Sequence, residues 1–171
     1  MTALSPDLVG RAFAPTAEEV AATRPFDRPT LVLDPRVVAR NYRALKDGLD
    51  GARIHYAVKA NPAREVISTL VAEGSGFDAA SRGEIELCLS QGARPEAISF
   101  GNTIKRESDI AFAHAAGITL FAADAEEELE KIARAAPGAR IYLRVIVEPS
   151  GADWPLTRKF GCAPDRVEGL A

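Results

Sequence analysis

A lysine at the end of a short apolar run has the type and position best suited to chemistry in this sequence. Residues 54–62 read IHYAVKANP. Side chains alternate across a strand, so the bulky apolar ones would face one way, and His55, Ala57 and Lys59 the other. A partly desolvated lysine has a lowered pKa, which makes its amine a nucleophile toward carbonyl groups. Ala57, two residues earlier on the same face, leaves room for a flat ring. From the pattern alone, a lysine that simply snorkels to water remains an open alternative.

The elements that must position this lysine alternate between short apolar runs and segments with helical spacing. The predicted strands are residues 30–33, 54–60, 76–79, 98–100, 120–123 and 141–145. The predicted helices are residues 35–48, 62–73, 81–91, 106–116 and 125–135, with a further short candidate at residues 16–23. From residue 54 the strands begin about every 22 residues, a spacing typical of parallel strands joined by crossover helices.

Two architectures share this strand–helix rhythm: an open doubly wound sheet and a closed eight-stranded barrel. No G-x-G-x-x-G segment follows a strand, and this absence favours the barrel. In barrel enzymes the chemistry lies at the carboxyl ends of the strands, where Lys59 would stand. A barrel needs eight units and about 250 residues. Only five units follow from residue 54, so we expect this chain to be a fragment or a truncated form.

Several residues are suited to begin or end these helices. Asn61 before Pro62 predicts a capped helix start, and Ser81 with Glu84 has the S-x-x-E form of a capping box. Asp124 is predicted to cap the helix that follows it. The glycines at positions 74, 92 and 117 stand where helices should end.

The composition narrows the class of protein further. The chain is 47% apolar and 26% charged, and 21 basic residues oppose 24 acidic ones. This balance is typical of a globular protein and argues against nucleic acid or an anionic membrane as partner. The two cysteines, Cys88 and Cys162, fit neither a metal knuckle nor a disulfide framework. We therefore expect no metal site. No secretory signal or membrane-spanning run of about 20 residues occurs, so we expect a cytoplasmic location.

Four segments together resemble one known family. Residues 56–62 (YAVKANP) resemble the pyridoxal-phosphate lysine motif of the fold type III decarboxylases, which are alanine-racemase-like barrels. Residues 74–85 (GSGFDAASRGEI) are similar to the second-strand motif of the ornithine branch. Residues 143–145 (LRV) and 158–161 (RKFG) match the fifth strand and the segment after it. The resemblance runs from about residue 30 to the end, and implies an α/β partial (β/α)8 barrel without the carboxyl-terminal β-domain.

The resemblance also implies roles for individual residues. Lys59 resembles the lysine that binds pyridoxal 5'-phosphate covalently, and Asp78 resembles the acidic residue beside the cofactor, with helix capping as its alternative role. Arg144 resembles the arginine near the cofactor at the end of the fifth strand, where a plain ion pair is the competing interpretation. Lys159 resembles a lysine near the dimer interface, where two subunits complete each active site. The implied cofactor-binding residues are Ala57, Lys59, Asp78 and Arg144.

Other residues with reactive side chains fit the chemistry less well. His55 lies deeper on the predicted strand than Lys59, which favours a core role, and His114 is expected to be a solvated helix residue. Neither cysteine matches the family's catalytic cysteine, which comes from the carboxyl-terminal domain. The acidic run at residues 126–128 lies in a first helical turn, where the helix dipole favours negative charge.

The resemblance predicts a pyridoxal-phosphate-dependent decarboxylase of a basic amino acid, with conversion of ornithine to putrescine as the leading activity. The family forms homodimers, whereas the isolated 171-residue chain is expected to be inactive. The alternatives are a non-catalytic decarboxylase-like regulator, and a racemase or pyridoxal-phosphate carrier of the same fold. The predicted domains are an amino-terminal arm and linker at residues 1–29 and the barrel portion at residues 30–171.

Overall fold

The computed structural model describes residues 15–147 and 160–170. Its centre is a five-stranded parallel sheet in the order β1-β2-β3-β4-β5, so each strand pairs with the next strand along the chain. The strands are β1 (His55–Ala57), β2 (Gly76–Ala79), β3 (Ile98–Phe100), β4 (Leu120–Ala123) and β5 (Arg140–Leu143).

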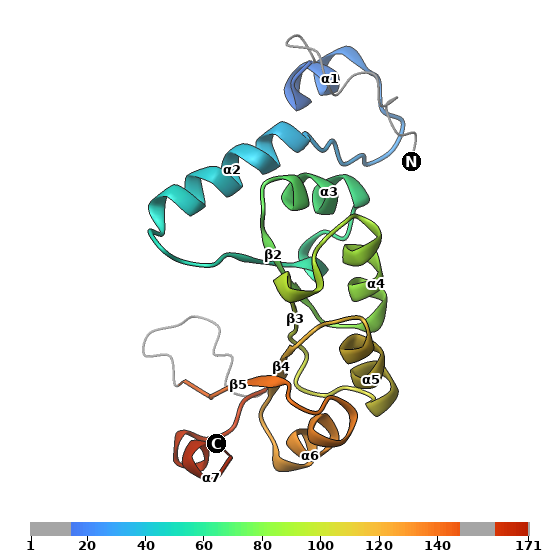
Figure 1. Ribbon diagram of the computed structural model, residues 1–171. Coiled ribbons are helices and arrows are strands. Elements are labelled where there is room, and N and C mark those ends of the chain that lie inside the picture. The colour runs from blue at the N-terminus through green and yellow to red at the C-terminus, as the bar shows by residue number, and fades with distance from the viewer. Residues whose placement is uncertain (1–14, 148–159, 171) are drawn as a thin grey trace.

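The helices lie between and around these strands (Figure 1). They are α1 (Ala17–Thr23), α2 (Pro35–Gly48), α3 (Arg64–Ala72), α4 (Arg82–Ser90), α5 (Glu107–Ala115), α6 (Glu126–Ala135) and α7 (Val167–Leu170). Short 3-10 turns are formed by Val58–Ala60, Pro95–Ala97 and Pro164–Arg166. Helices α3 to α6 all lie on the same side of the sheet (Figure 1). A doubly wound sheet has helices on both faces, so sequential strand order with one-sided helices confirms the predicted α/β partial barrel.

The hydrophobic core fills the space between the sheet and helices α3 to α6. Phe77, Phe100 and Phe121 project from β2, β3 and β4 and are almost completely buried. The rings of Phe100 and Phe121 lie 6.2 Å apart between centroids. Each such side chain contributes about 1.5–3 kcal/mol when it leaves water, so this layer holds the sheet to its helices. The helices supply mainly isoleucines, namely Ile67, Ile85, Ile110 and Ile132.

The opposite face of the sheet carries the polar residues. In the strand register, Ala57 pairs with Asp78 and Asp78 with Ser99. Since alternate residues face opposite sides, these three side chains share the face that the helices leave open. On the neighbouring strands, Ala122 pairs with Tyr142 on the same face. The sheet register therefore places on one face side chains from all five strands, which the sequence distributes over more than 80 residues.

Several of the predicted helix boundaries are confirmed. Helix α2 spans the predicted residues 35–48, and Thr16 caps α1 with a full capping box. Ser81 caps α4 by accepting a hydrogen bond from the Glu84 amide. The glycines at positions 74, 92 and 117 have φ of 79°, 89° and 94°, the left-handed conformation that ends a helix.

Other predicted boundaries were wrong. Residues 30–33 form no strand, because no neighbouring strand pairs with them among the described residues. Strand β1 ends at Ala57, where its pairing with β2 ends, and residues 58–60 turn into a 3-10 helix instead. Helix α3 begins at Arg64 rather than after Asn61, whose side chain accepts from the Ala63 amide instead. Asp124 does not cap α6, because it accepts a hydrogen bond from the Gly161 amide.

No helix in the described part of the chain is long and apolar enough to cross a membrane.

Candidate functional site

Lys59 stands directly after β1, at the edge of the sheet where all five parallel strands end. It lies in the 3-10 turn Val58–Ala60, between Val58, which is completely buried, and Ala60. The buried Val58 anchors the turn, while Lys59 is exposed. Its Nζ makes no hydrogen bond or ion pair within residues 15–147 and 160–170. The structure therefore presents a free primary amine at the predicted position, although in a turn rather than in the strand.

Asp78 lies at the centre of a hydrogen-bonded cluster on the open face. The Ser99 hydroxyl donates to Asp78 Oδ1 at 2.9 Å, and the Tyr142 hydroxyl donates to the same oxygen at 3.4 Å. Burial and the negative charge of Asp78 raise the pKa of Tyr142 to about 12, so its hydroxyl keeps its proton at neutral pH. The side chain that caps α4 is that of Ser81, so Asp78 does not have the helix-capping role that was its alternative.

Two glycines make room for the polar side chains of the open face. A Cβ on Gly101 would lie only 1.9 Å from Asp78 Oδ1, so the carboxylate occupies the space that a side chain would need. A Cβ on Gly76 would lie 2.9 Å from the His55 ring. His55 is itself exposed, which corrects the predicted core role: no described element covers this face of the sheet. A side chain at either glycine would therefore clash with a neighbour on the open face: with Asp78 at position 101 and with His55 at position 76.

Arg144 follows β5 at the same edge. Its guanidinium carbon lies 5.3 Å from the centre of the Phe160 ring, a cation–π contact. Its amide donates to the Ala123 carbonyl, and its own carbonyl accepts from the Cys162 amide. The positive charge of Arg144 acts to lower the pKa of Tyr142, against the stronger effects of burial and Asp78. Arg144 thus lies near the Asp78 cluster, and it makes no ion pair within the described ranges.

A buried ion-pair cluster lies beside the site, between the segment after β3 and helix α6. Lys105 Nζ lies 2.9 Å from Glu128 Oε1, with the two side chains 0% and 5% exposed, and it donates to the carbonyls of Asn102 and Ala122. Lys131 Nζ lies 2.5 Å from the other carboxylate oxygen of Glu128. Burial lowers the pKa of Lys105, and Glu128 opposes that shift. Glu128 lies in the first turn of α6, as predicted, but nothing in the sequence indicates that its carboxylate is buried against two lysines.

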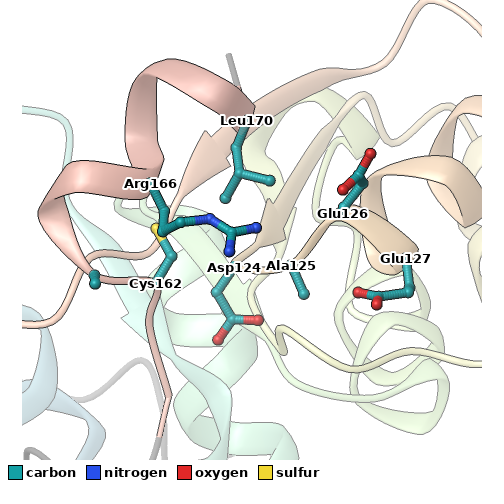
Figure 2. Close-up of a pocket in the computed structure, with 8 residues that line it drawn as sticks. Asp124, Ala125, Glu126, Glu127, Cys162, Arg166 and Leu170 are labelled. Carbon is teal, nitrogen blue, oxygen red and sulfur yellow. The ribbon is translucent and has the colours of Figure 1, made fainter.

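A pocket of about 250 Å³ opens at the start of α6 (Figure 2). Asp124, Arg166 and Cys162 are among the residues that line it (Figure 2). None of Lys59, Asp78 and Tyr142 lines it. The pocket is therefore separate from the polar cluster on the open face of the sheet.

The remaining predictions concern the dimer-interface lysine and a metal site. Lys159 lies outside the described residues. Within the described residues, no three histidine, cysteine, aspartate or glutamate side chains are grouped so as to hold a metal ion. Ser99 and Lys105 were not singled out from the sequence. The strand alternation that placed Asp78 inward could have found Ser99, since both follow from the same register.

The fold and the site together define a class. They describe the amino-terminal part of a barrel that offers a free lysine at the end of its first described strand. A carboxylate lies on the neighbouring strand, with small residues on the face between them. This set of groups suits an aldehyde cofactor, because the amine can attack the carbonyl and the small residues leave room for a ring.

The comparisons with known proteins agree with this class. The family model described as the pyridoxal binding domain of pyridoxal-dependent decarboxylases matches residues 36–171. The chain belongs to this family, which confirms the predicted family and cofactor.

Individual relatives give the same result. The chain is 41% identical over 144 residues to a chloroplastic ornithine decarboxylase of Nicotiana glauca, covering 84% of this chain and 33% of the relative. Lysine/ornithine decarboxylase of Vibrio vulnificus, solved with putrescine, superposes with a TM-score of 0.77 at 35% identity, covering 91% of this chain and 41% of that one. Lysine decarboxylase of Selenomonas ruminantium gives 0.80 at 31% identity, with coverages of 92% and 42%. The chain spans about a third of the length of the curated relatives it matches.

Proposed function

We propose that this chain is the cofactor-binding portion of a pyridoxal-phosphate-dependent decarboxylase that acts on a basic amino acid. The observation that carries the proposal is the free amine of Lys59 at the carboxyl edge of the sheet, in a chain of this family. When bound, pyridoxal phosphate supplies the electron sink that stabilises the carbanion left after loss of carbon dioxide.

The residues of the chain have distinct roles in this proposal. Lys59 would hold the cofactor through its amine, which is exposed in the turn after β1. Ala57, paired with Asp78 across the sheet, keeps the space between them free for the cofactor ring. Asp78 supplies a negative charge beside the ring, and Arg144 supplies a positive one from the end of β5.

Ornithine is the proposed substrate, with putrescine and carbon dioxide as products. The support comes from the sequence motif of residues 74–85 and from relatives named as ornithine decarboxylases. A pocket discriminates one methylene by only about 1–3 kcal/mol, so lysine is the first competitor to measure. The Vibrio vulnificus relative is named as an enzyme for both amino acids.

The organisation of the whole protein follows the family in this proposal. Residues 1–29 form an amino-terminal arm and linker, and residues 30–171 form the first part of the barrel. The full-length protein is a cytoplasmic homodimer, with Lys159 near the interface between the two subunits. A non-catalytic regulator of the same fold has no need of a free lysine at position 59.

The test is to replace Lys59 in the native gene product. Lys59→Ala should abolish both the absorbance of lysine-bound pyridoxal phosphate and the release of carbon dioxide from ornithine. Lys46→Ala, which removes an exposed lysine in α2, is the matched control and should leave both unchanged. Cofactor absorbance in the wild type without release of carbon dioxide from ornithine, lysine or arginine would favour the racemase or carrier alternative. No absorbance at all would favour the regulator.

A further inference from the structure

The carboxylate of Asp78 is held by groups that no sequence motif of the family singled out. Its Oδ1 atom receives two hydroxyl donors, from Ser99 on β3 and Tyr142 on β5. Its Oδ2 atom makes no hydrogen bond within the described part of the chain. The two oxygens of one carboxylate are therefore in different environments, one occupied by the protein and one available.

The Ser99 hydroxyl has a single proton and two acceptors within reach. It lies 2.9 Å from Asp78 Oδ1 and 3.3 Å from the Phe77 carbonyl. The shorter contact is to the charged acceptor, which forms the stronger hydrogen bond. Ser99 is itself only 4% exposed, so water does not compete freely for its hydroxyl.

The Tyr142 hydroxyl donates to the same oxygen from β5, the last strand of the sheet, on the same open face. Tyr142 and Asp78 are 64 residues apart in sequence, and β3 and β4 lie between their strands in the sheet, so this hydrogen bond spans the open face across two strands. The phenol keeps its proton at neutral pH, because burial and the charge of Asp78 raise its pKa to about 12. It therefore acts as a donor over the whole physiological range.

Gly101 completes the arrangement by leaving a space next to the carboxylate. Its amide donates to the Ala79 carbonyl at 2.8 Å, which fixes the backbone close to β2. The missing Cβ is what lets Asp78 Oδ1 lie in this position. Side-chain donors on two strands and a glycine on the loop after β3 thus define one conformation of Asp78.

We propose that Ser99 and Tyr142 are positioning residues, which bind Asp78 Oδ1 so that Oδ2 is held ready to interact with the cofactor. This inference rests on the proposed function, because it assigns these two hydroxyls to the binding of pyridoxal phosphate. Neither residue touches the reacting atoms in this account, and both act through Asp78. A group held in its productive orientation before binding costs less to order when the ligand arrives.

The test is a double-mutant cycle on cofactor affinity in the native gene product. Cofactor is removed, and the dissociation constant is measured by absorbance titration with pyridoxal phosphate. Ser99→Ala and Tyr142→Phe should each raise the dissociation constant about three- to tenfold, the range expected for one lost hydrogen bond. In an Asp78→Ala background neither substitution should have any further effect.

Two matched controls separate positioning from general destabilisation. Ser75→Ala removes another buried serine hydroxyl, which donates to the Gly76 carbonyl at the start of β2. Tyr42→Phe removes the hydroxyl of a buried tyrosine in α2. Both controls should leave the dissociation constant unchanged. Ser99→Thr, which keeps the hydroxyl, should restore tighter binding than Ser99→Ala.

Either of two results overturns the inference: unchanged affinity in Ser99→Ala and Tyr142→Phe, or an equal loss of affinity with and without Asp78. If the wild type itself binds no pyridoxal phosphate, the proposed function fails and a second measurement decides the positioning role. Crystal structures of the cofactor-free wild type and of Ser99→Ala/Tyr142→Phe would then be compared. A rotated Asp78 side chain in the variant supports the positioning role, and an unmoved side chain refutes it.

Discussion

Removal of Glu128 should destabilise the protein far more than its place in a run of three glutamates suggests. The side chain of Lys105 is 0% exposed and its charge is balanced by Glu128 at 2.9 Å. Glu128→Ala leaves that buried ammonium without a counter-charge, a change that typically costs about 3–5 kcal/mol. It also removes the acceptor of the Lys105 amide at 3.1 Å. We therefore expect the free energy of unfolding, measured by urea denaturation at pH 7, to decrease by about 3–5 kcal/mol or more relative to the wild type.

The effect should depend on pH in a defined direction. Burial lowers the pKa of Lys105 in the folded protein, and loss of Glu128 removes an influence that raises it. An unfolded lysine titrates near pH 10.4. Between the folded and unfolded pKa values the unfolded chain binds more protons, so stability rises with pH in that window. The deficit of Glu128→Ala should therefore be complete below the folded-state pKa of Lys105 in the variant, and shrink as the pH rises from there to the folded-state pKa of Lys105 in the wild type.

Two further variants make this prediction refutable. Glu86→Ala breaks the exposed Arg82–Glu86 pair on α4 and should cost about 0.5 kcal/mol or less. Lys105→Met/Glu128→Leu removes both buried charges, but it also leaves the carbonyls of Asn102 and Ala122 without their donor, so it should be more stable than Glu128→Ala and less stable than the wild type. If Glu128→Ala costs no more than Glu86→Ala, or if its deficit does not change with pH, the account of a buried charge is wrong.

Two other predictions test the site and the incomplete sheet. Gly101→Ala should turn Asp78 away from Ser99 and weaken pyridoxal-phosphate binding about tenfold, as measured by absorbance titration; Gly83→Ala, where a Cβ meets nothing within 4 Å, should not. Residues 1–171 expressed alone should associate in size-exclusion chromatography and release no carbon dioxide from ornithine, because β1 and β5 are the edges of the described sheet. A sharp cooperative melt from a monomer, together with turnover of ornithine, would contradict this.

The strand–helix rhythm was readable from the sequence because its signals are local. Glycines that end helices adopt positive φ because they have no Cβ, a property of the residue itself, as at Gly74. The alternation within β2 likewise placed Asp78 opposite the buried Phe77. The exact end of β1 was not readable, because it depends on how far β2 continues to pair with it.

The buried ion pair could not be read from the sequence for a related reason. Three glutamates in a row are all typical of a first helical turn, and which of them faces inward depends on the residue at which α6 begins. The sequence favoured Asp124 as the cap, whereas the helix is preceded by Ala125 and Asp124 binds the Gly161 amide. Lys105 lies in a polar segment, and its partner is 23 residues away. Only the tertiary structure brings the two charges together.

The position of this ion pair suggests why a charged residue is present where an apolar one would cost less to bury. Lys105 Nζ donates to the carbonyls of Asn102 and Ala122, which lie at the ends of neighbouring strands. An apolar side chain would leave both carbonyls without this donor, and each unsatisfied buried group costs about 1–3 kcal/mol. The same ammonium thus fixes the segment that follows β3, and Gly101, next to Asn102, makes the space that Asp78 occupies. Stability at α6 and the conformation of Asp78 are for this reason linked through one short segment, residues 101–105.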